Sequence, residues 1–176
     1  MQSHDVVLIR GAPGIGKSTI GELLRVAAPN GAIVDIDKIR RMLNKERFIY
    51  NENHEYRNAT IAAGALVKSF LSSKYSPVVV IDVFSKPILE LFINQMQGHS
   101  LISIILHADD EVLSARMTNR TNGYINVDVA RRVSQHIYDT RSETDFMIDT
   151  TLLGPHDVLR CVLDLLDYRS LIQDKR

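Results

Sequence analysis

A glycine-rich loop between an apolar segment and a helical pattern constrains this chain more than any other feature of its sequence. Residues 11–18 read Gly-Ala-Pro-Gly-Ile-Gly-Lys-Ser and match the pattern G-x-x-x-x-G-K-[ST]. The segment from Val6 to Ile9 is entirely aliphatic, as in a strand that is buried on both faces. A helical pattern follows, with Ile20 and Leu24 on one face. This order predicts an α/β fold with the loop at the carboxyl end of the strand.

Each position of this loop suits the binding of a nucleotide's phosphates. Glycines let backbone N–H groups converge on phosphate oxygens, and the N-terminus of the following helix adds partial positive charge. Lys17 is expected to reach the β- and γ-phosphates, and the Ser18 hydroxyl is expected to bind Mg²⁺. A chance glycine-rich turn is the alternative, and the strand before it and the helix after it argue against that reading. The predicted ATP-binding residues are Gly11, Ala12, Pro13, Gly14, Ile15, Gly16, Lys17, Ser18 and Thr19, together with Arg116 and Arg120.

Four more short apolar segments alternate with helical patterns along the chain. They are expected to be strands at residues 32–34, 78–81, 101–106 and 146–148. Alternation of this kind predicts a doubly wound, parallel α/β sheet with ligands at the carboxyl ends of the strands. The chain of 176 residues, 45% of them hydrophobic, has the size and composition of one domain.

Charge and cysteine content exclude several classes of protein. Lys and Arg number 21, as do Asp and Glu, so strong bulk electrostatic binding of nucleic acid is not expected. The one cysteine, Cys161, allows no internal disulfide and lies on an apolar helical face, which predicts a core residue. No apolar run reaches the ~18 residues of a membrane span, and the first residues lack a signal peptide. We therefore expect a cytoplasmic protein without a membrane partner.

Carboxylates follow the second and third predicted strands. Asp35 and Asp37 lie on the same side if the second strand continues that far. A carboxylate there can accept the proton of an attacking hydroxyl or hold Mg²⁺. Asp37 is also a good N-cap for a helix over residues 38–43, and both roles are compatible. Asp82 ends an aliphatic strand, which is typical of an Asp near a metal. Asp37 is thus the predicted general base, and the metal candidates are Ser18, Asp35 and Asp82.

Arginines flank a predicted turn in the second half of the chain. Arg116 and Arg120 are four residues apart and share a helix face, and Arg131 and Arg132 follow on the next helix. Guanidinium groups stabilise charge on transferring phosphoryl oxygens, so this region suits a lid over a triphosphate. A solvated helix face with surface arginines is the alternative. The predicted lid spans about residues 116–132, with Arg120 as its catalytic arginine.

The sequence resembles the P-loop kinase group that includes adenylate and shikimate kinases. The resemblance covers nearly the whole chain and implies a single kinase domain over residues 1–176 with a five-stranded sheet in the order 2-3-1-4-5. It also implies that residues 150–155 contact the adenine. Asp37-x-x-Arg40 is similar to the D-x-x-R element of 5′-hydroxyl polynucleotide kinases, in which the Asp is the base and the Arg binds acceptor phosphate. Chloramphenicol phosphotransferases and zeta-type toxin kinases have a similarly placed Asp.

The predicted function is an ATP-dependent phosphotransferase that uses Mg²⁺ and acts on a hydroxyl acceptor. Lys17, Asp37 and Arg120 are the predicted catalytic residues, and Asp37 and Arg40 are the predicted acceptor-binding residues. The acceptor is a nucleic-acid 5′-end, a nucleotide, a sugar or an antibiotic, in a pocket between residues 39–57 and the end of the third strand. Residues 54–57 either line this pocket or simply start a helix.

Two other functions remain open. A GTPase-type switch or other NTP hydrolase would share the loop, but the base-reading N-K-x-D element is missing: the only Asn-Lys pair, Asn44-Lys45, lacks its Asp. A non-catalytic nucleotide-binding module would also keep the fold. The presence of Lys17, Ser18 and Asp37 argues against such a module.

Overall fold

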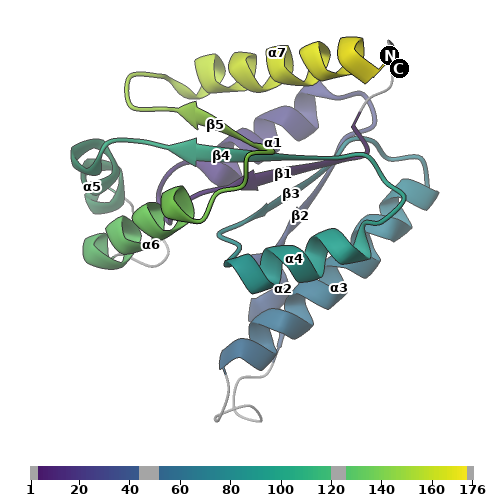
Figure 1. The fold of residues 1–176 in the computed structure, drawn as a ribbon, viewed down its shortest axis with the longest axis horizontal. Coiled ribbons are helices and arrows are strands. Elements are labelled where there is room, and N and C mark those ends of the chain that lie inside the picture. Colours follow the sequence, from purple (N-terminus) through teal and green to yellow (C-terminus); the bar gives the residue numbers. More distant parts are fainter. Residues whose placement is uncertain (1–3, 44–51, 120–125, 174–176) are drawn as a thin grey trace.

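A computed structural model describes residues 4–43, 52–119 and 126–173 of the chain, except for the side chains of residues 52–53 and 168–173. Helices and strands alternate along it (Figure 1). The elements are β1 (Val6–Arg10), α1 (Lys17–Ala27), β2 (Ala32–Asp35), α2 (Ile36–Met42), α3 (Glu52–Ser72), β3 (Val78–Asp82), α4 (Lys86–Gln95), β4 (Leu101–His107), α5 (Asp110–Thr118), α6 (Val127–Asp139), β5 (Asp145–Asp149) and α7 (Pro155–Gln173). All five predicted strands are present.

The five strands form one parallel sheet in the order β2-β3-β1-β4-β5, which confirms the predicted fold class and strand order. Every residue of β1 and β3 is buried, as the aliphatic runs at 6–9 and 78–81 predict, and the burial extends to the charged residues that end them, Arg10 and Asp82. Arg10 at the end of β1 is in register with Asp82 at the end of β3. The loop after β1 therefore begins beside the carboxylate that ends β3.

Alternate residues of the central strand face two separate cores. Val7 and Ile9 pack with residues of α1 and α7 on one face of the sheet. Val6 and Leu8 pack with residues of α3 and α4 on the other (Figure 1). Burial on both faces fixes the strand register, because a shift by one residue would exchange the two sets of side chains.

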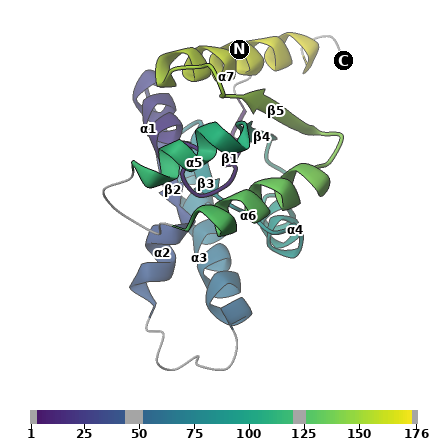
Figure 2. The ribbon, with the colours of Figure 1, turned by 90° about the vertical axis from the view of Figure 1, so that its left-hand side faces the viewer.

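The carboxyl ends of the strands make one edge of the molecule (Figure 2). In this view α5 and α6 lie in front of the sheet, while α2 and α3 extend below it. β1 lies between β3 and β4, so the connections that follow these strands leave in different directions at this edge. A change of direction of this kind at the carboxyl edge is where doubly wound sheets bind their ligands.

One prediction about the core is wrong. Cys161 is exposed, although it lies on a helix with an apolar face. The stripe of α7 that reaches the sheet runs through Val158 and Val162, which are buried, and Cys161 lies beside that stripe. Within the described ranges, the helices are all too short or too polar to cross a lipid bilayer.

Candidate functional site

The loop between β1 and α1 depends on glycine at both of its ends. Gly11 has a φ of 151°, and a Cβ there would lie 2.8 Å from the backbone oxygen of Leu106. Gly16 has a φ of 108° and is the N-cap of α1, where no side chain caps the helix. The N-terminus of α1 therefore keeps its partial positive charge available at the loop, which is the arrangement that binds phosphate.

The side chain of Lys17 folds back over this loop. Its Nζ donates hydrogen bonds to the carbonyl oxygens of Gly11 and Ala12, each at 2.9 Å. Ser18 and Thr19, in the first turn of α1, are exposed. An ammonium group, an uncapped helix N-terminus and two accessible hydroxyls together suit the triphosphate of a nucleotide with its metal.

The segment after β2 differs from the prediction. The strand ends at Asp35, which is the N-cap of α2 and accepts a hydrogen bond from the backbone N–H of Lys38 at 3.3 Å. The predicted cap at Asp37, with a helix over residues 38–43, is therefore wrong, because the chain turns into a helix two residues earlier. Asp37 lies in the first turn of α2 instead, and its carboxylate is 56% exposed. This placement leaves Asp37 accessible to a substrate.

Arg40 lies among two carboxylates and an aromatic ring. Its Nη1 is 3.1 Å from Oδ1 of Asp37, and its Nε is 3.5 Å from Oε1 of Glu55. Its guanidinium carbon is 4.7 Å from the centroid of the Tyr56 ring, a cation–π geometry. Arg40 thus joins α2 to the first turns of α3, at the place where the acceptor pocket is predicted.

Asp82, at the end of β3, is buried and held on both carboxylate oxygens. Oδ2 accepts a hydrogen bond from the Tyr56 hydroxyl at 2.5 Å, and Oδ1 accepts one from the backbone N–H of Val83 at 2.7 Å. Burial raises the pKa of Asp82 to about 6, the two hydrogen bonds oppose the rise, and the charges of Asp37 and Lys17 act on it in opposite directions. Burial and the Asp82 carboxylate also raise the pKa of Tyr56. Asp82 therefore lies within electrostatic reach of both Lys17 and Asp37.

Arg116 lies in the last turn of α5, and its side chain contacts the segment after β5. Its guanidinium donates to Oγ1 of Thr150 at 2.8 Å and to the Thr150 carbonyl at 2.7 Å. Thr150 is buried, and its hydroxyl also donates to the carbonyl of His107. These bonds hold Arg116 beside the loop over residues 150–155. The predicted contacts of Arg116 with ATP, and of this loop with the adenine, stay predictions. Arg120 falls outside the described residues, as does the centre of the predicted lid.

No group of three or more His, Cys, Asp or Glu residues that could hold a metal ion occurs in the described part of the chain. Mg²⁺ seldom needs such a group, since one or two protein ligands suffice when nucleotide phosphates and waters complete its shell. Ser18 beside the loop and Asp82 near Lys17 fit that pattern. Asp35 faces Lys38, whose Nζ is 3.8 Å from its carboxylate, so its charge is partly balanced within α2.

Sequence reasoning missed how these residues are joined. Tyr56 was expected only to line a pocket or start a helix, whereas it binds Asp82, which lies 26 residues further along the chain. The contact of Arg116 with Thr150 spans 34 residues. No local pattern encodes contacts of this range. The one signal in the sequence is that Asp82 ends β3 and Thr150 directly follows β5, at the edge where a parallel sheet brings distant segments together.

The sheet order and the loop geometry define the fold of the P-loop kinase group. The chain belongs to the AAA_18 family, described as an AAA domain, whose model matches residues 7–139. No curated protein sequence matches the chain.

Solved structures confirm the fold over the whole chain. A gluconokinase from Sinorhizobium meliloti 1021 is 19% identical, with a TM-score of 0.76 and full coverage of both chains. The tunicamycin resistance protein of Deinococcus radiodurans is 16% identical, with a TM-score of 0.69 over 92% of this chain and 95% of that one. Shikimate kinase from Aquifex aeolicus is 18% identical, with a TM-score of 0.62 over 94% and 98%.

Proposed function

We propose that this chain is an ATP-dependent phosphotransferase that moves the γ-phosphoryl group of Mg·ATP to a hydroxyl of a small molecule. The observation that carries the proposal is the geometry of the loop after β1, where Lys17 folds over an uncapped helix N-terminus and the adjacent strand ends at Asp82. The ammonium group of Lys17, the buried carboxylate of Asp82 and the exposed carboxylate of Asp37 belong to segments at the carboxyl ends of β1, β3 and β2, which share one edge of the sheet. A transfer site needs these three kinds of group.

The residues divide into a donor side and an acceptor side. Lys17 and the N-terminus of α1 bind the β- and γ-phosphates, and Ser18 and Asp82 would hold the Mg²⁺ that accompanies the nucleotide. Bound Mg²⁺ neutralises charge that develops on the phosphoryl oxygens. Asp37 takes the proton of the acceptor hydroxyl while the acceptor oxygen bonds to the γ-phosphorus. The bond from that phosphorus to the β–γ bridging oxygen breaks, and ADP leaves.

The class of acceptor is inferred from two sources. Similar structures include a gluconokinase, a sugar kinase and a shikimate kinase, which favours a small hydroxylated acceptor. These similarities offer no support for a nucleic-acid 5′-end. The accessible Asp37 beside Arg40 suits a hydroxyl on a small polar molecule.

An NTP hydrolase is the second candidate, and it rests on the family's description as an AAA domain. The two candidates differ in what they need for turnover. A hydrolase consumes ATP without an acceptor, whereas a phosphotransferase does so only slowly. A non-catalytic nucleotide-binding module neither hydrolyses ATP nor transfers its phosphate.

The test is transfer of label from γ-labelled ATP to a panel of sugars, nucleotides, nucleic-acid 5′-ends and hydroxyl-bearing antibiotics. We expect labelled product with one of the small-molecule classes and slow ATP hydrolysis without acceptor. The control is Lys17→Ala, which should fold but lose transfer, because Lys17 contacts the loop rather than the core. Rapid ATP turnover that no acceptor changes would establish the hydrolase instead. Full activity of Lys17→Ala would contradict both.

A further inference from the structure

We propose that Tyr56 is a positioning residue of this site, one whose hydroxyl holds Asp82 on the nucleotide side while its ring holds Arg40 on the acceptor side. The proposal rests on the proposed function. Tyr56 does not itself touch the reacting atoms. It acts through the two groups that it contacts.

The hydroxyl contact fixes the direction of a buried carboxylate. The Tyr56 oxygen is 2.5 Å from Oδ2 of Asp82, whose other oxygen is held by the Val83 N–H. Asp82 is 5% exposed, so water offers little replacement if the phenol is removed. A buried carboxylate that loses a donor changes its orientation or its charge. The donor therefore sets where Asp82 can place its remaining lone pairs.

The ring contact fixes an arginine that belongs to a different helix. Arg40 lies on α2 and stacks over the Tyr56 ring on α3, while it also pairs with Asp37 and Glu55. The ring packs against the Arg40 guanidinium, and the ion pairs with Asp37 and Glu55 fix the orientation of the guanidinium on the ring. Because Arg40 pairs with Asp37, the ring also helps to place the predicted general base.

Both contacts belong to one side chain, so Tyr56 connects the two halves of the site. On one side lies Asp82, in register with Arg10, the residue directly before the phosphate-binding loop. On the other lie Arg40 and Asp37. The backbone carbonyl of Tyr56 accepts the Thr60 hydroxyl at 2.8 Å within α3, a bond that any residue at this position would keep. The hydroxyl and the ring are thus the parts that only tyrosine supplies together.

Two substitutions separate the contacts. Tyr56→Phe keeps the ring and removes the hydroxyl. We expect kcat to fall roughly 10- to 100-fold, which is the usual loss when a residue that orients a metal ligand is changed. The KM for the acceptor should stay near the wild-type value. Tyr56→Leu removes both contacts and should in addition raise the KM for acceptor. The matched control is Tyr75→Phe, since Tyr75 is 45% exposed and packs on Phe70 near the amino end of β3. It should behave as wild type.

A double-mutant cycle isolates the hydroxyl contact. Asp82→Ala removes the acceptor of the Tyr56 hydroxyl and should make a further Tyr56→Phe change nearly silent in kcat, because residues in contact act non-additively. The double variant also removes the buried charge that would otherwise lose its donor, so if Tyr56→Phe folds poorly, the double variant can still be compared with Asp82→Ala alone. A wild-type kcat for folded Tyr56→Phe, or fully additive losses, would overturn the proposal.

A binding measurement separates this proposal from the proposed function. We would measure the Kd of ATP by calorimetry with and without Mg²⁺, in wild type, Tyr56→Phe and Tyr75→Phe. The positioning role predicts that Tyr56→Phe reduces the gain in affinity that Mg²⁺ gives, while Tyr75→Phe keeps it. If wild type transfers phosphate to no acceptor, the proposed function fails and this readout still applies. An unchanged gain in Tyr56→Phe would then overturn the role of Tyr56.

Discussion

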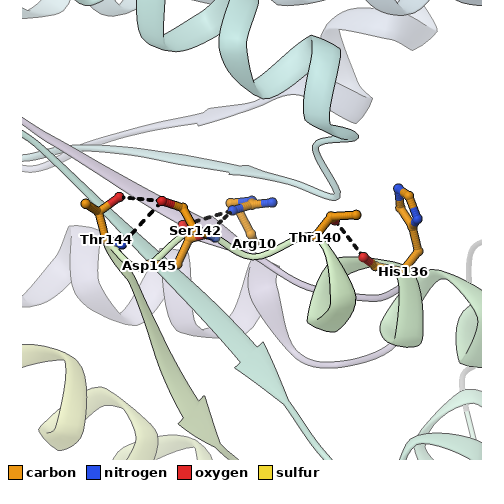
Figure 3. A network of polar contacts seen from close by, with 6 residues as sticks. All are labelled: Arg10, His136, Thr140, Ser142, Thr144 and Asp145. Carbon is orange, nitrogen blue, oxygen red and sulfur yellow. Dashed lines mark hydrogen bonds and ion pairs between the residues drawn. The ribbon is translucent and has the colours of Figure 1, made fainter.

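The guanidinium of Arg10 forms a buried, two-bonded ion pair with the carboxylate of Asp145, across β1 and β5. Nη1 of Arg10 lies 2.9 Å from Oδ1 and 3.0 Å from Oδ2 of Asp145, and the two side chains are 1% and 3% exposed. Asp145 also accepts the backbone N–H of Ser142 at 2.8 Å (Figure 3). The pair connects the residue directly before the phosphate-binding loop with the turn that leads from α6 into β5.

Removal of one partner of this pair should destabilise the fold strongly. Asp145→Ala leaves the Arg10 charge buried without its counter-ion, and such a change costs about 3–5 kcal/mol. The double variant Arg10→Met with Asp145→Leu should recover most of this loss, because apolar residues of similar size tolerate burial. The measurement is the free energy of unfolding by denaturant titration. A loss below about 1 kcal/mol in Asp145→Ala would show that water reaches the pair.

Substitution of Asp35 should lower mainly the stability of the protein, and substitution of Asp37 should lower mainly its activity. Asp35→Ala removes the N-cap of α2 and should cost about 1 kcal/mol of stability. Asp37→Asn keeps the shape of an exposed side chain, so the thermal midpoint should change little. As the predicted general base, Asp37→Asn should lower single-turnover transfer by ~10²-fold or more, with ATP affinity unchanged. Near-wild-type transfer would exclude Asp37 and leave Asp35 or Asp82 as the base.

The raised pKa of Asp82 should make its own contribution to stability depend on pH. The pKa is about 6 in the folded protein against 3.8 for an ordinary Asp, so the folded state binds the proton more tightly. The contribution of Asp82 to stability should therefore be largest below about pH 4 and fall as pH rises towards 6, by at most about 3 kcal/mol. Without Mg²⁺ and nucleotide, Asp82→Asn should be more stable than wild type at pH 7.5, and the difference should shrink near pH 4. Parallel pH profiles for the two proteins would contradict this expectation.

Arg120 is expected to act mainly in the transition state. Arg120→Ala should lower kcat by roughly 10²-fold or more while the KM for ATP changes less, as for an arginine that meets transferring charge. Arg116→Ala is the informative comparison, because Arg116 is bound to Thr150 and should affect ATP affinity as well. The measurement is steady-state kinetics at saturating acceptor. An unchanged kcat in Arg120→Ala would make Arg120 a surface residue.

The sequence by itself determined the sheet, its strands and the phosphate-binding loop. Aliphatic runs such as Val6 to Ile9 are local signals, because a strand buried on both faces can contain little else. The loop is equally local, since glycine is required where φ is positive or another backbone approaches, as at Gly11 and Gly16. The strand order 2-3-1-4-5 came from resemblance to a family rather than from the residues.

Only the tertiary structure decided how the site residues are joined. The start of α2 depended on where β2 leaves the sheet, and this made Asp35 the cap and placed Asp37 in the first turn of the helix. The bond between Tyr56 and Asp82 depends on α3 packing across the end of β3, and the pair of Arg10 with Asp145 depends on β5 joining the sheet edge. Hydropathy patterns record which face of an element is buried. They do not record which buried polar groups meet, because those contacts form only when segments distant in sequence pack together.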